Sequence, residues 1–351
     1  MAESIGVGIA GYGYAGRSFH SYLAGLADGL HVRGIMAPRS EQRQQAAREH
    51  SCATYARFED VLADDGVGLV VLATPHDTHC DLAIQAMQAG KHVVTDKIIC
   101  MTVEEADRMM EEAERQGVLF SVFHNRRWDG DFLTVKQVMG ESLLGDINLV
   151  EQCVYGYNSP RTWRGEIGRV GSLLYDWGAH LVDQALLLIR EPVDHVLGTA
   201  QFRREGQTVE TWGRCQITFA GGTVWVVEQS NMALATKPHW FILGTTGSLV
   251  KHGVDPQEAY MKRGEIENAT ENLAERAVVT TTMEGERSTV VPETIRGDWR
   301  AYYQNIADVL LTGAELAVKP AECRRALRVL NAYKESCRTG MPVILDNDVV
   351  V

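Results

Sequence analysis

Residues 5–16 read IGVGIAGYGYAG, and this stretch decides the fold. Ile5, Val7 and Ile9 predict a short apolar strand that runs into the pattern G-x-G-x-x-G. The first glycine allows a tight turn, the second lets a pyrophosphate approach the backbone, and the third lets a helix pack closely on the strand. Backbone N–H groups at the start of that helix favour an anion. We interpret the stretch as a dinucleotide-binding loop rather than a glycine-rich turn without a ligand, formed by Gly11, Tyr12, Gly13, Tyr14, Ala15 and Gly16.

The composition is that of an ordinary globular protein of about two domains. The chain has 351 residues, of which 45% are hydrophobic and 23% charged, with a formal net charge of −12 that argues against a nucleic-acid partner. No apolar run approaches the roughly 18 residues that a membrane span needs. The seven cysteines are scattered and never spaced C-x-x-C, which indicates reduced thiols. Since a strand begins almost at once, we expect no secretory signal and a cytoplasmic location.

Strands and helices alternate over the first third of the chain. Strands are predicted at 31–36, 68–75, 92–98 and 118–123, and helices at 77–89 and 102–116. The run at 68–75 is almost wholly apolar, which is typical of a parallel strand covered on both faces. Thr102 and Glu105 form a capping box, and Gly90 follows the end of the earlier helix. We predict a doubly wound parallel α/β sheet of the Rossmann type over residues 1–123.

The pattern changes over residues 124–351, which we assign to a second domain. Segments 147–157, 196–203, 208–219 and 223–231 alternate polar and apolar residues, as in an antiparallel sheet with one wet face. Helices are expected at about 130–141, 171–189, 297–312 and 320–338, with a short strand at 341–345. Residues 262–290 show no clear period. The second domain is therefore predicted to be an α/β domain with an open antiparallel sheet.

The end of the second strand bears on which dinucleotide binds. NAD sites usually place a carboxylate about 20 residues past the glycines to bind the ribose hydroxyls. Here Ala37 takes that place and is followed by Arg39, Ser40 and Arg43. A cation and a hydroxyl suit a 2′-phosphate, so NADP is favoured and NAD stays possible. The alternative is that the two arginines only coat a solvated helix start.

Two short stretches carry residues suited to hydride-transfer chemistry. Lys97 lies at the carboxyl end of a predicted strand, where open α/β sheets bind ligands. If residues 171–189 are helical, Asp176, His180 and Asp183 share one face. Such a set is either a satisfied buried network or a site. The dinucleotide loop in the same chain favours a site.

Oxidising an alcohol with NAD(P) removes a hydride from carbon and a proton from oxygen. A histidine near its ordinary pKa can accept that proton, and an adjacent carboxylate can orient it. A lysine ammonium can stabilise the developing alkoxide, or take the proton itself where its pKa is lowered. The sequence leaves open whether Lys97 or His180 is the base.

Further polar residues are candidates to line the site. Asn125 follows the sixth strand and is placed to touch the nicotinamide or the substrate. Trp163 and Arg164 suit a polyhydroxylated ligand by stacking and forked hydrogen bonding, although a packed indole beside a surface arginine fits equally well. His79 is expected at a helix N-terminus beside the cofactor. No metal is expected, because no C-x-x-C or H-E-x-x-H pattern accompanies His76, His79, Cys80 and His92.

Over essentially its whole length the chain resembles the glucose-fructose oxidoreductase, inositol dehydrogenase and MocA-like (Gfo/Idh/MocA) oxidoreductases. Within the family it is most similar to the NADP-linked scyllo-inositol dehydrogenase branch, through the strings GYGYAGRSFH, HNRRWDGDFLT and YDWGAHLVDQ. Its Asp96-Lys97-Ile98 stands where the family usually has Glu-Lys-Pro. The resemblance is carried by residues 11–16, Thr74-Pro75, residues 90–94, Asp96-Lys97 and the spaced set Asp176, His180 and Asp183.

The resemblance implies a Rossmann domain followed by a C-terminal α/β domain with a large open, mostly antiparallel sheet. That sheet would pack against a partner subunit in a homodimer or homotetramer. The catalytic residues would be Lys97, Asp176 and His180. With the residues discussed above, the expected substrate contacts are these three together with Asn125, Trp163 and Arg164. The expected cofactor contacts are the glycine loop, Arg39, Ser40, Thr74, Pro75, His79, Asp96, Lys97 and Asn125.

The expected function is reversible oxidation, with NAD(P), of a ring hydroxyl of a sugar or a cyclitol such as an inositol. One alternative is a dehydrogenase of a glycoside or sugar derivative that uses NAD. Another is a non-catalytic regulator that binds a dinucleotide. A regulator has no need for Lys97, Asp176 and His180 together, so their presence favours an enzyme.

Overall fold

The computed structural model describes residues 4–141, 143–158, 162–205, 208–283 and 285–350. The chain forms two compact units, each described here by itself. Unit 1 comprises residues 1–125, 259–266 and 298–324, and unit 2 comprises residues 126–258, 267–297 and 325–351. In the described part, none of the helices has the length and apolar character to cross a bilayer. The boundary expected at residue 123 between a dinucleotide-binding domain and a substrate-binding domain stays a prediction.

Unit 1 is built on a six-stranded sheet in which every pairing is parallel. The strand order β3-β2-β1-β4-β5-β6 is that of a dinucleotide-binding Rossmann sheet. β1 and β4 are buried along nearly their whole length, as expected for strands with both faces covered. The strands are β1 (Ile5–Ala10), β2 (Leu30–Met36), β3 (Ala53–Tyr55), β4 (Leu69–Leu72), β5 (His92–Thr95) and β6 (Phe120–Val122).

Short helices connect these strands, and one helix of unit 1 comes from late in the chain. The helix after the glycine loop contains a π-turn, η1, that runs into α1. α10 packs Tyr302 and Tyr303 against Phe123, with ring centroids 4.9 and 5.8 Å apart. The helices are η1 (Gly16–His20), α1 (Ser21–Ala24), α2 (Ser40–His50), α3 (Phe58–Leu62), η2 (His76–Thr78), α4 (His79–Gln88), α5 (Val103–Gln116) and α10 (Arg300–Thr312).

Unit 2 contains a nine-stranded, mostly antiparallel sheet in the order β14-β13-β12-β11-β7-β10-β9-β8-β15. β7 and β10 form its parallel pair among the described strands. The strands are β7 (Ile147–Tyr155), β8 (Val193–Gln201), β9 (Trp212–Phe219), β10 (Val224–Ser230), β11 (Trp240–Gly244), β12 (Gly247–Lys251), β13 (Val278–Met283), β14 (Glu286–Val290) and β15 (Val343–Ile344).

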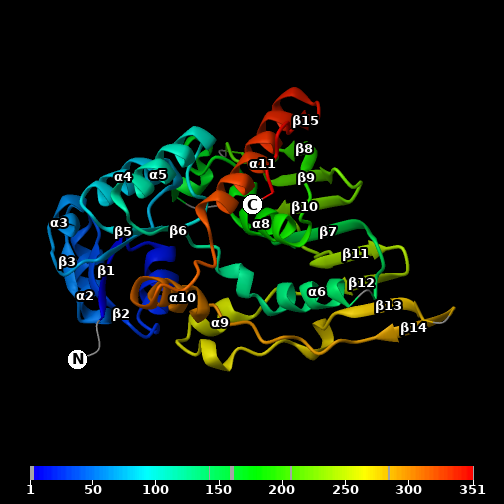
Figure 1. Cartoon of the computed structure of the whole chain (residues 1–351), viewed down its shortest axis with the longest axis horizontal. Coiled ribbons are helices and arrows are strands. Elements are labelled where there is room, and N and C mark those ends of the chain that lie inside the picture. The colour runs from blue at the N-terminus through cyan, green and yellow to red at the C-terminus, as the bar shows by residue number, and fades with distance from the viewer. Residues whose placement is uncertain (1–3, 142, 159–161, 206–207, 284, 351) are drawn as a thin grey trace. The chain divides into compact units, whose positions relative to one another are not determined.

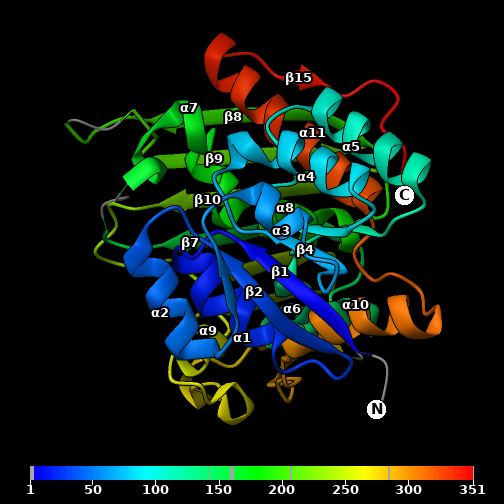
Figure 2. The ribbon, with the colours of Figure 1, turned by 90° about the vertical axis from the view of Figure 1, so that its left-hand side faces the viewer.

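Helices α6, α8 and α11 lie over one face of this sheet (Figures 1 and 2). The backbone N–H of Gly178 in α8 donates to the side chain of Gln229 of β10 at 3.3 Å, so Glu228, the residue before it in the strand, faces the opposite side. α11 begins in unit 1 and continues into unit 2. Three short helices, η3 (Asn125–Trp128), α9 (Gln257–Met261) and η6 (Ile266–Asn268), also include residues of both units. The other helices are α6 (Gly130–Gly140), η4 (Thr162–Gly165), α7 (Ile167–Val170), η5 (Leu173–Tyr175), α8 (Trp177–Leu188), η7 (Leu273–Glu275) and α11 (Pro320–Thr339).

The predicted fold class is confirmed for both sheets. The capping box of α5 is present, and Gly90 has φ of +72° directly after the C-cap of α4. The strand expected at 92–98 ends at Thr95. The amide of Asp96 still bonds to β4, but the amide of Lys97 and the carbonyl of Ile98 bond to side chains instead. Residues 262–290, which had no clear pattern, contain two 3₁₀ turns, the edge strand β14 and its neighbour β13.

Candidate active site

The loop at residues 11–16 is tightly packed at both ends and open in the middle. Gly11 has φ of +104°, and a Cβ atom there would overlap the carbonyl oxygen of Ala73. A Cβ atom at Gly16 would overlap the carbonyl oxygen of Gly11. At Gly13 a Cβ atom would meet no described atom within 4 Å. The exposed backbone of Gly13 therefore leaves the space that a pyrophosphate requires.

The two tyrosines of the loop have different environments. Tyr12 is buried and its hydroxyl donates to Glu49 of α2 at 2.5 Å. Arg17 donates to the same carboxylate at 2.8 and 2.6 Å, and these bonds lower the pKa of Glu49 to about 2. Tyr14 is half exposed, with the Nζ atom of Lys262 5.1 Å from its ring centroid. Tyr12 thus ties the loop to α2, while Tyr14 and Lys262 lie beside the open position.

The end of β2 presents one arginine to solvent and uses another to close the turn. Arg43 donates to the carbonyl oxygens of Ala37 and Pro38 at 2.7 and 2.8 Å. Arg39, at the N-cap of α2, and Ser40, its first residue, are both exposed. Nε of Arg39 donates to Gln42 at 3.0 Å. Arg43 therefore has a structural role, and Arg39 with Ser40 forms the group suited to a 2′-phosphate.

His79 connects the ends of β4 and β5. Its ring is fully buried at the start of α4, with Nδ1 2.8 Å from the carbonyl oxygen of Ile98 and Nε2 3.1 Å from that of Thr74. Burial lowers the pKa of His79, against the opposing charge of Asp96. Next to it, the Thr78 hydroxyl donates to Thr74 and to the carbonyl oxygen of Pro75, each at 2.7 Å. His79 thus supports the strand ends, and its predicted contact with the cofactor stays a prediction.

Lys97 lies in the loop that follows β5. The amide of Asp96 donates to the carbonyl oxygen of Leu72 at 2.8 Å, which keeps the loop beside β4. Oδ1 of Asp96 accepts from the amide of Lys97 at 2.8 Å and lies 3.8 Å from Nε2 of His20. The peptide bond between Lys97 and Ile98 is cis. The expected position of Lys97 at the carboxyl end of β5 is what the structure shows, and its chemical role stays a prediction.

Asn125 carries a buried donor with no acceptor among the described residues. Its side chain is 2% exposed, and Nδ2 makes no hydrogen bond in that part of the structure. A buried amide group without a partner costs roughly 1–3 kcal/mol, so such groups usually have a reason. An acceptor on a bound molecule would satisfy it, which fits the predicted contact with the nicotinamide or the substrate.

In unit 2 the segment before α8 brings three predicted residues together. Nη1 of Arg164 lies 3.4 Å from Oδ1 of Asp176, and its guanidinium lies 5.4 Å from the Trp163 ring centroid. Trp163 itself packs on a small core of Val170, Leu173 and Val209. Both Arg164 and Asp176 are more than a third exposed. The Trp163 indole therefore packs against this core, while the Arg164 guanidinium and the Asp176 carboxylate remain accessible to a polar ligand.

Asp176, His180 and Asp183, which were expected to share one helix face, have different structural environments. α8 begins at Trp177, so Asp176 is its N-cap residue and lies outside the first turn. His180 is 5% exposed within the helix. Asp183 accepts from Nε and Nη2 of Arg127 at 2.8 and 2.6 Å, and both side chains are buried. Asp183 is thus half of a bidentate ion pair within unit 2.

Two residues near the predicted site were missed by the sequence analysis. Lys262 returns to unit 1 from a segment without periodicity, and His20 lies inside the string GYGYAGRSFH. Its place in that string, four residues after Gly16, is the one local signal that could have identified His20. No local pattern pointed to Lys262.

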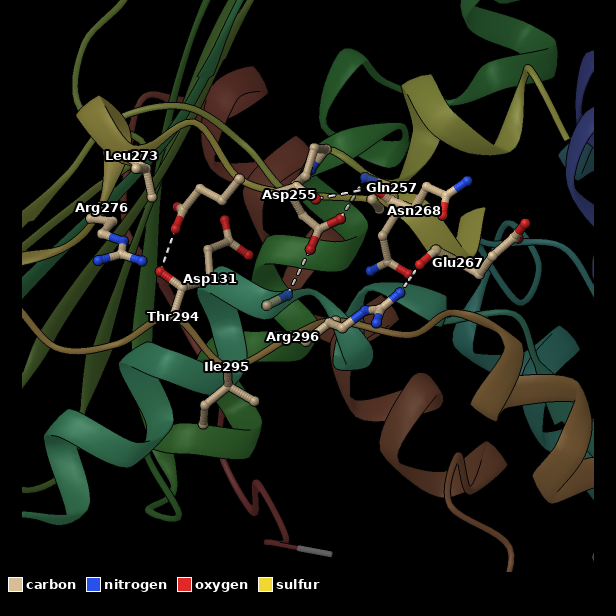
Figure 3. A pocket seen from close by; sticks show the side chains of 16 residues that line it. Asp131, Asp255, Gln257, Glu267, Asn268, Leu273, Arg276, Thr294, Ile295 and Arg296 are labelled. Carbon is tan, nitrogen blue, oxygen red and sulfur yellow. Dashed lines mark hydrogen bonds between the residues drawn. The ribbon is translucent and has the colours of Figure 1, made fainter. Parts of the chain in front are cut away.

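A polar cavity of about 420 Å³ lies in unit 2, and its described lining includes none of the predicted site residues. Figure 3 shows the side chains of Asp131 and Asp255 at this cavity. Asp255 accepts from the amides of Gly130 and Gln257 at 2.7 and 2.8 Å, and its pKa is raised by burial and by Asp131. Across the described residues, no group of three or more His, Cys, Asp or Glu side chains could hold a metal ion.

Comparison with known proteins agrees with this architecture along the whole chain. Residues 5–124 match the model of an oxidoreductase family with an NAD-binding Rossmann fold, and residues 132–250 match the GFO/IDH/MocA C-terminal domain. The NADP⁺-linked scyllo-inositol 2-dehydrogenase IolW of Bacillus subtilis is 31% identical, over 98% of this chain and 97% of its own.

Two further relatives bear on the fold and on the cofactor. The structure of the oxidoreductase-family protein YvaA from Bacillus subtilis superposes with a TM-score of 0.91 at 30% identity, covering 99% of both chains. The NAD⁺-linked scyllo-inositol 2-dehydrogenase of the same organism is 23% identical over 99% of this chain and 98% of its own. An NADP⁺-linked and an NAD⁺-linked relative therefore both match this chain along nearly its whole length. The chain belongs to the Gfo/Idh/MocA family of NAD(P)-binding oxidoreductases.

Proposed function

We propose that this protein is an NADP-preferring dehydrogenase that interconverts a ring hydroxyl and a ring ketone of a cyclitol or sugar. The observation that carries the proposal is the position of Lys97, directly after β5 in the same unit as the open glycine loop. The similarity to the NADP⁺-linked scyllo-inositol dehydrogenase supports the substrate class. At 31% identity the particular polyol is left to experiment.

In this proposal Lys97, Asp176 and His180 act on the reacting oxygen. A bound nicotinamide supplies the hydride acceptor or donor. The ammonium of Lys97 donates a hydrogen bond to the oxygen and stabilises its developing negative charge. His180 accepts the proton and Asp176 orients the imidazole ring of His180; alternatively, Lys97 takes the proton directly. Arg164, within 3.4 Å of Asp176, and the donor of Asn125 bind neighbouring polar groups of the substrate or cofactor.

The test measures binding and turnover separately. NADPH and NADH binding is followed by fluorescence titration, and turnover of inositols and sugars by absorbance of the reduced nicotinamide. Lys97→Met and His180→Asn should each lower kcat by about 10²- to 10⁴-fold with unchanged dinucleotide affinity. Lys136→Met and His252→Asn, at exposed positions, are the matched controls. Normal turnover in either site variant removes that residue from the mechanism, and binding without turnover over the panel favours the regulator.

The preference for NADP rests on Arg39. Its exposed guanidinium at the start of α2 can form charge-assisted bonds to a 2′-phosphate, which are worth about 1.5–3 kcal/mol each. Arg39→Gln should therefore weaken NADPH binding by about tenfold or more while NADH binding is unchanged. Arg48→Gln, exposed at the far end of the same helix, is the control. An equal loss for both dinucleotides contradicts the proposed preference.

We also propose that the sheet face opposite α8 assembles with a second copy of the chain. On that face Glu228 is nearly buried by Trp212 and Lys237, which bond to it at 2.6 and 2.8 Å. A mixed polar and aromatic surface of this kind is compatible with an interface. Light scattering should give the mass of a dimer or tetramer, and a monomer at micromolar concentration contradicts the proposal.

A further inference from the structure

Beneath the loop that carries Lys97, unit 1 contains a buried polar chain that begins at Asp96. The Asp96 carboxylate accepts from the Lys97 amide at 2.8 Å and therefore fixes the backbone from which the Lys97 side chain extends. Its own amide is bonded to Leu72, so Asp96 joins the lysine loop to the neighbouring strand end. Any group that fixes this carboxylate also fixes the starting point of Lys97.

His20 is the group that faces this carboxylate from the dinucleotide-binding helix. Its side chain is fully buried, with Nε2 3.8 Å from Oδ1 of Asp96 and Nδ1 2.7 Å from the hydroxyl of Tyr303. The ring of Phe123 packs against the imidazole with centroids 4.5 Å apart. His20 is thus held on one side by α10 and on another by the end of β6.

The charges favour an ionised Asp96. Burial raises the pKa of a carboxyl group, but His20, Lys97 and His79 together bring the pKa of Asp96 below its usual range. Burial raises the pKa of Tyr303, so its hydroxyl stays protonated and can bond to the Nδ1 atom of His20. The other ring nitrogen of His20, Nε2, lies 3.8 Å from Oδ1 of Asp96 and has no hydrogen-bond partner among the described residues.

The helix carrying His20 begins at the glycine loop. His20 is the last residue of the π-turn at Gly16–His20, and single π-turns in helices are frequent at functional sites. The same short helix therefore contributes the dinucleotide loop at one end and the neighbour of Asp96 at the other. Tyr303 adds a contact from a part of the chain 283 residues away.

We propose that His20, held by Tyr303, is a positioning residue that orients Asp96 and through it Lys97. The inference rests on the proposed role of Lys97 in turnover. His20 itself touches neither substrate nor cofactor in this proposal. Its loss leaves the glycine loop and Arg39 in place and displaces the lysine loop. The rate of the chemical step should then fall while dinucleotide affinity is kept, because misplacement of a reacting group by about 1 Å can cost 10²-fold.

The experiment compares His20→Phe, His20→Gln and Tyr303→Phe, with His31→Phe at an exposed position as control. His20→Phe and Tyr303→Phe should lower kcat by about 10- to 100-fold with unchanged KM and NADPH affinity. His20→Gln should restore part of the loss, since a side-chain amide also presents an N–H group to Asp96. The double variant should be no slower than His20→Phe, because both residues act through one chain of contacts.

A second readout does not depend on turnover. Competitive acetylation of the intact protein, followed by mass spectrometry, gives the reactivity of each lysine. His20→Phe and Tyr303→Phe should change the labelling rate at Lys97 and leave that of exposed Lys136 unchanged. Tyr303→Phe removes one hydroxyl only, so it keeps the test valid where a His20 variant fails to fold.

The outcomes separate this inference from the proposed function. Folded His20→Phe and Tyr303→Phe proteins with normal kcat and normal Lys97 labelling overturn the positioning role, as does a parallel loss of NADPH affinity. Normal turnover in Lys97→Met overturns the proposed function instead. In that case the labelling experiment still decides whether His20 orients the lysine loop.

Discussion

The three glycines of the dinucleotide loop are required for two different physical reasons. At Gly11 and Gly16 a side chain would overlap a backbone carbonyl, so these glycines serve the packing of the fold. At Gly13 the space is open and φ lies outside the left-handed region, so alanine is tolerated there unless a ligand occupies the space. Substitutions at these positions should therefore separate an effect on folding stability from an effect on dinucleotide affinity.

We expect Gly13→Ala to unfold at the same denaturant concentration as the parent protein or a higher one, because alanine reduces the entropy of the unfolded chain. Its affinity for NADPH should fall, since the methyl group fills the pyrophosphate space. Gly16→Ala should lose about 1–3 kcal/mol of stability from overpacking. Denaturant unfolding and fluorescence titration check both. Full NADPH affinity in Gly13→Ala contradicts the assigned space.

The Arg127–Asp183 ion pair predicts a stability effect where the sequence had suggested chemistry. Breaking a buried pair from one side leaves an unpaired charge and costs about 3–5 kcal/mol. Asp183→Asn should therefore lower the free energy of unfolding by that amount. The double variant Arg127→Met, Asp183→Leu should recover much of the loss, because no charge stays buried alone. A stable but inactive Asp183→Asn protein would instead support a catalytic role.

At the scale of single elements, the sequence predicted best where the stabilising contacts are local. The capping box of α5 lies within four residues, and both of its bonds are present: Glu105 N to Thr102 Oγ1 at 3.2 Å and Thr102 N to Glu105 Oε2 at 3.1 Å. The strand expected to reach residue 98 was too long, because the amide of Lys97 bonds to the Asp96 carboxylate and the carbonyl of Ile98 bonds to the His79 ring rather than to a neighbouring strand. β13 and β14 went unplaced because they are stabilised by pairing with β12 and with each other.

The N-cap residue of α5, Thr102, should contribute measurably to the stability of the protein. Thr102→Ala removes the acceptor for a backbone N–H at the helix start and should cost about 1 kcal/mol of stability. Thr102→Ser keeps that acceptor and should stay close to the parent protein. Chemical denaturation of both variants at one pH is the measurement. Equal stability of the alanine and serine variants would mean that the bond at 3.2 Å contributes nothing.

At the scale of the whole molecule, the sequence predicted those residues of the candidate site that a local pattern marks, and missed contacts between residues far apart in the chain. The glycine loop and Lys97 follow from strand ends, which a local pattern reveals. The partners of Asp183 and His20 lie 56 and 283 residues away in the chain, so no local pattern identifies them. Lys262 likewise reaches Tyr14 only because the fold returns residues 259–266 to unit 1.

Stability should depend on pH through the buried acids of unit 2. His239, 3.2 Å from Asp131, lowers the pKa of that carboxyl against the opposing effect of burial. A lowered pKa contributes stability that is complete above the unfolded value of about 3.9 and is lost as the pH falls. The free energy of unfolding should therefore decrease below about pH 4. Asp131→Asn should make that decrease shallower and lower the stability at neutral pH.

Asp255→Asn is the comparison for this pH series, because its pKa is shifted in the opposite direction. A raised pKa means that the folded protein binds the proton more tightly, so this group favours folding as the pH falls. Removing this carboxyl group should therefore make the decrease in the free energy of unfolding at low pH steeper. Urea unfolding from pH 3 to pH 7 measures both slopes, and identical slopes in the two variants would contradict the assignment.

The late segments of unit 1 have a consequence for how the chain is made. Phe19, His20 and Phe123 are synthesised first, whereas the aromatic residues within 299–303 that pack against them, and the last residue of the unit, Arg324, come about 175–200 residues after Phe123. At about 5–20 residues per second, a ribosome takes roughly ten to forty seconds to supply them. During that interval the emerging N-terminal half exposes an aromatic surface and lacks one wall of its core. The dinucleotide-binding unit is therefore completed only after residue 324 has been made, and a fragment released at residue 125 should depend on chaperones to stay in solution.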